Sequence, residues 1–229
     1  MKKILCALLS VAGFALVGCS STSAPSSTAS YTASDDDPGF MENYNIFKPV
    51  AVPESGMRAW RYINPKFANH EYTAAIISSV KIYDPKFACQ IPYSTISGGE
   101  KMITTQTTQA LAKHNLALAT KPGLATLSLD MNVTGAMVYK ATGKLKNFVP
   151  LSTAITYAAS EAVAAPSDYS AVVIVGGKAT DTKSGLLVVG SYVAVPAANF
   201  VNKTASAAAF ESALAPAVQL SLNNFVENK

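Results

Sequence analysis

Cys19 is the residue of this 229-residue sequence whose surroundings most clearly point to chemistry. It ends a Leu-Val-Gly-Cys tetrapeptide that follows two lysines and an apolar run over residues 4–17. That run is too short for a permanent membrane-spanning helix and fits the apolar region of a secretion signal. Small residues before a cysteine are the lipobox pattern, at which bacterial lipoprotein signal peptides are cut. Cleavage would free the amino group of Cys19, and its thiol would carry acyl chains such as palmitate. An ordinary signal peptide with a chance cysteine is the alternative.

The anchor predicts where the protein resides. Each buried acyl CH₂ contributes about 0.8 kcal/mol, so two or more chains hold an attached domain at a membrane. Ser20 follows the cysteine, whereas in enteric-type bacteria Asp at this position retains a lipoprotein at the inner membrane. We therefore expect a lipid-anchored outer-membrane protein that faces the periplasm. Residues 20–37 are rich in Ser, Thr, Ala and Asp, a composition that predicts a flexible tether.

The composition is that of an exported globular protein. Hydrophobic residues make up 49% of the chain, and charged residues only 14%, against about 25% in typical soluble domains. Alanine, serine and threonine fill the difference, which favours an envelope protein over a cytosolic enzyme. The net charge of +4 is small and scattered, which argues against a nucleic-acid partner.

Residues suited to catalysis or metal binding are scarce in the sequence. The two histidines, His70 and His114, have no carboxylate or cysteine at ligand spacing, so we expect no metal site. No Gly-x-Ser-x-Gly motif is present, and three consecutive aspartates, Asp35–Asp37, lie in the tether. We therefore expect neither catalytic residues nor a cofactor, and a protein that is not an enzyme.

Hydrophobic periodicity predicts an α+β domain with a mixed four-stranded sheet and helices packed on it. The predicted strands are residues 72–83, 124–139, 169–180 and 186–195. The predicted helices are residues 97–115, residues 148–164 and a last helix from residue 204. Ser97 and Glu100 form a capping-box pattern, Gly185 is placed for a left-handed residue in a hairpin turn, and Pro216 predicts a kink or two short helices.

Aromatic residues and prolines without helical or strand period fill residues 38–70, which predicts an extended arm packed on the domain. The pattern runs Gly39-Phe40-Met41, Tyr44, Phe47-x-Pro49 and then Tyr62-Ile63-Asn64-Pro65. It resembles the opening of a family of uncharacterised bacterial outer-membrane lipoproteins, catalogued as a domain of unknown function. Asn43 and Asn45 stand where that family usually has Asp and Ser. The resemblance implies a fold and a location, and it implies no activity.

The predicted organisation therefore has four parts: a signal peptide (1–19), the tether (20–37), the arm (38–70) and an α+β domain (71–229). Basic residues beside the alanine-rich helix predict a contact with a partner or the membrane, made by Lys144, Lys146, Phe148 and Leu151. A crossover helix packed on the sheet is the alternative for this segment. We expect a non-catalytic binding or scaffold module that holds an envelope protein through a sheet edge or helix groove. The alternative is a small-molecule or lipid carrier with a pocket between the sheet and the alanine-rich helix.

Overall fold

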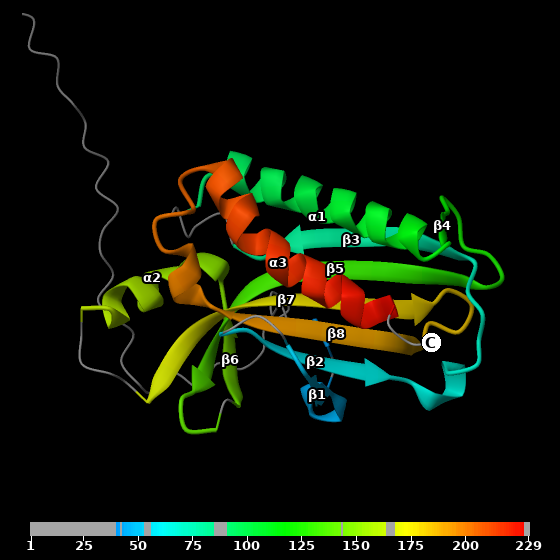
Figure 1. Ribbon diagram of the computed structural model, residues 1–229, viewed down its shortest axis with the longest axis horizontal. Coiled ribbons are helices and arrows are strands. Elements are labelled where there is room, and N and C mark those ends of the chain that lie inside the picture. The colour runs from blue at the N-terminus through cyan, green and yellow to red at the C-terminus, as the bar shows by residue number, and fades with distance from the viewer. Residues whose placement is uncertain are drawn as a thin grey trace, which may run out of the picture. The chain divides into compact units, whose positions relative to one another are not determined.

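The computed structural model describes residues 40–41, 43–52, 56–84, 91–142, 144–163 and 168–226. Strand β5 (Thr126–Tyr139) is its central element. Its alternation of apolar and polar residues gives one face to the core and the other to the opposite side of the sheet. Strand β7 pairs with one edge of β5 over its full length, while β3 and β6 share the other edge. Figure 1 shows β5 running between β3 and β7.

The described residues form an eight-stranded mixed sheet in the order β1-β2-β8-β7-β5-β3-β4, with β6 also paired to β5. The strands are β1 (Lys48–Val50), β2 (Arg58–Ile63), β3 (Ala74–Ile82), β4 (Ala117–Leu118), β5, β6 (Leu145–Val149), β7 (Tyr169–Asp181) and β8 (Leu187–Pro196). The α+β class and the mixed sheet are confirmed, but the predicted number of four strands is wrong. The four predicted strands correspond to β3, β5, β7 and β8, and the additional ones are six residues or shorter.

Three α-helices pack on one face of the sheet (Figure 1). They are α1 (Tyr93–Lys113), α2 (Leu151–Glu161) and α3 (Ala207–Val226); short 3-10 turns lie at Tyr44–Ile46, Pro65–Phe67 and Ala197–Phe200. Strands β3 and β5 run parallel, which requires a crossover, and α1 supplies it. None of the helices in the described part of the chain is long and apolar enough to cross a bilayer.

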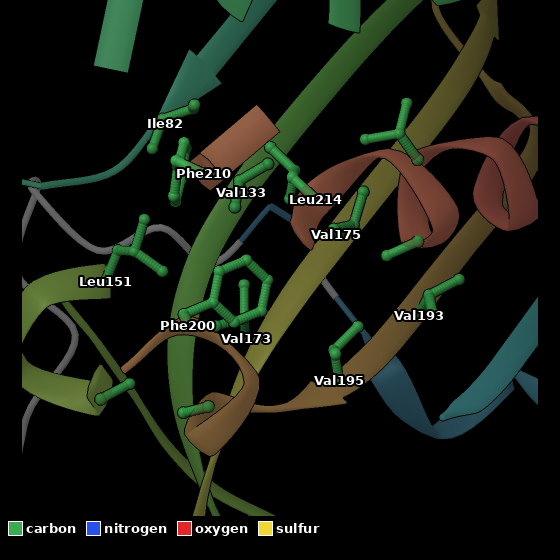
Figure 2. Packing of buried hydrophobic residues seen from close by; sticks show 14 of the residues in the cluster. Ile82, Val133, Leu151, Val173, Val175, Val193, Val195, Phe200, Phe210 and Leu214 are labelled. Carbon is green, nitrogen blue, oxygen red and sulfur yellow. The ribbon is translucent and has the colours of Figure 1, made fainter. Parts of the chain in front are cut away.

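The main core lies between this face and the helices. Figure 2 shows valines of β5, β7 and β8 projecting toward large side chains of the helical layer. Phe200, Phe210 and Leu214 are fully buried there, and the rings of the two phenylalanines lie 5.9 Å apart. Each such side chain contributes roughly 1.5–3 kcal/mol by leaving water, so the packing of α3 is a major source of stability.

The opposite face of the sheet is covered in part by residues 40–41 and 43–47. Phe47 is 7% exposed and lies against Gly190, and Phe40 lies against Gly176. Both glycines leave room for a ring directly on the strand. The predicted arm also contributes β1 and β2, so part of it belongs to the sheet itself.

The helix starts differ from the sequence prediction. Helix α1 begins at Tyr93 after Pro92, and Ser97 hydrogen-bonds the Ser94 carbonyl within it, so the predicted capping box at Ser97 is wrong. Residues 145–149 form β6, and α2 begins after Pro150. The Asp84 carboxylate caps this helix by accepting from the amide (3.1 Å) and the hydroxyl of Ser152. Helix α3 is continuous through Pro216, and Gly185 has the predicted left-handed backbone, with φ at +70°.

Candidate functional site

The residues predicted to contact a membrane or partner do not share one surface. Cys19 lies outside the described residues. Lys144 and Lys146 are exposed, and the Phe148 ring is half-buried against Tyr44, with 5.0 Å between ring centroids. Leu151 has no exposed surface, because it is the first residue of α2 and points into the core. Leu151 therefore cannot form part of a contact surface in this fold.

Lys146 belongs instead to a small cluster with two tyrosines. Its Nζ donates to the Tyr169 hydroxyl at 2.9 Å, and the Tyr139 and Tyr169 rings lie 4.6 Å apart. The hydrogen bond from Lys146 lowers the pKa of Tyr169, and the same bond raises the pKa of Lys146. These contacts fix the lysine on the strands rather than leaving it free to follow a membrane surface.

The two histidines and Asp130 contact neighbouring parts of the fold. His70 packs beside Phe67, with 5.4 Å between ring centroids, and His114 is the C-cap residue of α1. Ser79 donates to Asp130 at 2.6 Å on the face of the sheet opposite the helices. In the ranges that the structure describes, no three His, Cys, Asp or Glu side chains gather as a metal site would require.

The outer edge of β3 is the most distinctive open feature of the sheet. Strand β4 pairs with β3 only at Ala74 and Ala75, and the Ala75 carbonyl accepts from Ala119 at 2.8 Å. Alternation along the strand directs the backbone groups of Ile77, and after the bulge those of Val80, to the same side. The described strands leave these groups unpaired.

Helix α1 ends this open stretch. The Ile82 amide donates to Glu100 Oε1 at 3.1 Å, so the last outward amide of β3 has a partner. Between Ala75 and Ile82, a groove of about 760 Å³ runs along the edge of β3 beside α1. Its helical wall is polar and consists of Ser97, Glu100, Lys101, Thr104 and Thr108.

The other edge of the sheet is protected. Strand β1 has only three residues, and its middle residue is Pro49, which has no amide hydrogen to offer. Short strands and prolines are common protections of sheet edges against unwanted pairing. Compared with β1 at the opposite end of the sheet order, β3 therefore presents the longer open backbone edge.

A second hollow, of about 260 Å³, lies on the face of the sheet opposite the helices, between Arg58 and Trp60 of β2 and Tyr139 and Lys140 at the end of β5. The sequence alone indicates neither the groove nor this hollow. The run of β-favouring residues at 74–82 predicted a strand but not that it lies at an edge. Trp60, the single tryptophan of the chain, falls in the predicted arm.

A match to a protein-family model defines the class of this protein. The sequence model of a family described as "Protein of unknown function (DUF3313)" matches residues 36–219. The chain belongs to this family, which confirms the resemblance to a domain family without an assigned role. No curated protein matches the chain.

Two solved structures show a distant similarity to the chain. Both are PelC dodecamers from Paraburkholderia phytofirmans, one of them a single-residue variant. They are 11% and 12% identical to this chain, each with a TM-score of 0.37. The variant match covers 76% of this chain and 99% of PelC, and the other covers 74% and 97%.

Proposed function

We propose that this protein is a lipid-anchored outer-membrane protein, facing the periplasm, that acts as a non-catalytic binding module. In this proposal the open edge of β3 receives an extended segment of an envelope protein, which adds a short strand to the sheet. The observation that carries the proposal is the pair of outward backbone positions, Ile77 and Val80, beside a polar groove. A row of backbone donors and acceptors is matched best by another backbone.

The groove also has the dimensions for such a partner. The open stretch between Ala75 and Ile82 accommodates a few residues of an extended chain at about 3.3 Å per residue. Hydroxyl groups on the α1 wall can meet polar side chains of the added strand. The Thr104 and Thr108 hydroxyls donate to carbonyls one helical turn earlier, at 2.8 and 2.9 Å, which leaves oxygen lone pairs directed outward.

The packing of α2 favours this proposal over the carrier. A Cβ on Gly135 of β5 would meet Ala154 Cβ at 2.6 Å and the Pro150 carbonyl at 2.8 Å, so α2 lies directly on the sheet. The apolar cavity under α1 and α3, lined by Leu111, Leu129 and others, has about 60 Å³. Pockets that enclose a small molecule typically have about 300 Å³ or more.

Site-specific photocrosslinking in intact cells tests the binding edge. A benzophenone side chain in place of Ser78, which is exposed on the bulge of β3, should capture a discrete envelope protein. The same group in place of exposed Lys48 on β1, at the opposite edge, should not. Val80→Pro removes an outward amide at a sheet edge, where proline is tolerated, and should abolish the adduct.

Val80→Thr is the matched control, because threonine keeps the branched shape and the backbone amide. It should retain the adduct, and circular dichroism should find both variants folded. An adduct that persists in Val80→Pro, or that forms equally from position 48, contradicts binding at the edge. Recovery of lipid without a protein partner would support the carrier instead.

The anchor has its own test. Mass spectrometry of the mature protein should find an acylated Cys19 at its N-terminus. Cys19→Ser should prevent acylation and move the protein from the membrane fraction to the soluble fraction. A mature protein with an unmodified thiol in the soluble fraction would contradict the anchor without affecting the proposed edge.

A further inference from the structure

The hollow between β2 and the end of β5 has the composition of a ligand site, and it is separate from the β3 edge. Its floor is made by small or short side chains, among them Ala194 of β8 and Ser170 of β7. Strand β8 ends at Pro196, so the floor lies at the end of β8. The two sides come from β2 and β5, which the sheet order separates by β8 and β7.

The β2 side combines an aromatic ring with a cation. On one side, Trp60 stacks on Tyr192 with 4.7 Å between ring centroids and 15° between planes, and Arg58 lies two residues earlier on the same face. On the other side, strand alternation directs the Tyr139 ring, which packs on Tyr169, toward the helix face of the sheet, and Lys140 follows it in the chain. Because the Trp60 ring packs on a second ring, it is held in place before any ligand arrives.

The two cations at the hollow, Lys140 and Arg58, differ in whether an acidic side chain neutralises them. Lys140 Nζ pairs with Glu161 at 2.6 Å. Arg58 is exposed, and no hydrogen bond or ion pair joins its guanidinium to another residue of the described ranges. The hollow therefore carries an excess positive charge. A free guanidinium offers paired donors that match a carboxylate or a phosphate.

From this arrangement we infer that the hollow binds an anionic sugar, with the acidic group on Arg58 and the sugar ring against Trp60. The apolar Trp60 ring suits the C–H groups of a sugar ring, and the Ser170 hydroxyl, on the same face of the sheet, can hydrogen-bond a ring hydroxyl. The volume of about 260 Å³ limits the bound unit to a small ring compound. A carboxylated and a phosphorylated sugar share this chemistry.

The single tryptophan makes the site directly observable, because Trp60 is the only indole in the chain. Glucuronate and glucose 6-phosphate are titrated into the full folded domain, with glucose as the neutral probe, while tryptophan fluorescence is recorded. At least one acidic sugar should give a saturable change, and the more effective probe distinguishes carboxylate from phosphate. Glucose should bind at least about tenfold more weakly, as expected for loss of a charge-assisted bond.

Arg58→Gln should weaken the response about tenfold, whereas Lys113→Gln at the end of α1, outside the hollow, should leave it unchanged. Ser170→Ala provides a second variant within the hollow and should also weaken binding. An equal response to glucose and the acidic sugars, or no saturable response to either acid, overturns the inference. Val80→Pro should leave the fluorescence titration unchanged, so failure of the β3 proposal is distinguishable from failure here.

Discussion

The side chain of Glu100 in α1 accepts a 3.1 Å hydrogen bond from the backbone amide of Ile82, the last residue of the edge strand β3. A helix side chain thus takes the place of a neighbouring strand at this point. The bond both fastens α1 to the sheet and limits the length of the open edge. Because unpaired edge amides invite pairing with other chains, this contact controls how much of β3 is available.

Removal of this acceptor should lengthen the open edge. Glu100→Ala leaves the Ile82 amide without its partner, and we expect the free energy of unfolding to fall by about 1 kcal/mol. We also expect more self-association, measured by sedimentation velocity, because the freed amide extends the pairing surface. Glu100→Gln keeps a carbonyl acceptor and is the control. Equal behaviour of both variants would show that the hydrogen bond has no such role.

The contact between α2 and β5 should tolerate no added atom. Gly135→Ala places a methyl group at 2.6 Å from Ala154 Cβ, with backbone carbonyls close behind, and we expect a loss of about 1–3 kcal/mol. Denaturant unfolding measures this loss. The comparison is Gly123→Ala, whose added carbon meets only the Thr126 hydroxyl at 3.3 Å and should cost much less. An unchanged free energy of unfolding in Gly135→Ala would mean that α2 can move away from β5, which would favour the carrier.

Residues 43–47 should contribute to stability through one ring in particular. Phe47 is 7% exposed and contacts Tyr192 and Tyr62, with ring centroids 5.2 and 6.1 Å away. Phe47→Ala should lower the free energy of unfolding by about 3 kcal/mol. Ile46→Ala removes a neighbouring side chain that is 38% exposed and should change it by less than about 1 kcal/mol. Similar values for both would mean that this segment is not packed as described.

The same cluster predicts a loss of stability at alkaline pH. Burial raises the pKa of Tyr192 from 10.0 to about 12. The unfolded chain therefore loses this proton first, and the contribution of Tyr192 to stability falls as the pH rises from about 10 to about 12. A two-unit difference corresponds to about 2–3 kcal/mol.

Unfolding midpoints measured at several pH values should fall less steeply in Tyr192→Phe than in the wild-type protein over this interval. Tyr72, whose pKa burial also raises to about 12, contributes a parallel decrease in both proteins. Identical slopes would indicate that the Tyr192 hydroxyl reaches solvent in the folded protein.

Local sequence chemistry explains the elements that were predicted correctly. The alternation over 124–139 matches β5, because period two is a property of the strand backbone itself. The Asp181 carboxylate accepts from the Ser184 amide at 2.7 Å, and Gly185 supplies the left-handed residue, so the β7–β8 turn needs no distant partner.

The errors arose where distant contacts outweigh local preference. Phe148 continues the helical spacing of the residues after it, yet it lies in β6, because Pro150 separates the two segments and Gly135–Val138 of β5 offers strand pairing. The Ser97–Glu100 pattern suggested a helix start, but Glu100 bonds β3 instead. Trp60 and Arg61 lie in a strand because β8 pairs with them.

By itself, the sequence determined the four long strands, the β7–β8 turn and the α+β class, since these depend on periodicity and turn residues a few positions apart. Only the tertiary structure decided which strand lies at an edge, which side chains line the β3 groove and the hollow beside β2, and that Leu151 is buried. The physical reason is that an edge or a hollow is defined by the elements that do not cover it. No local pattern of residues records that information.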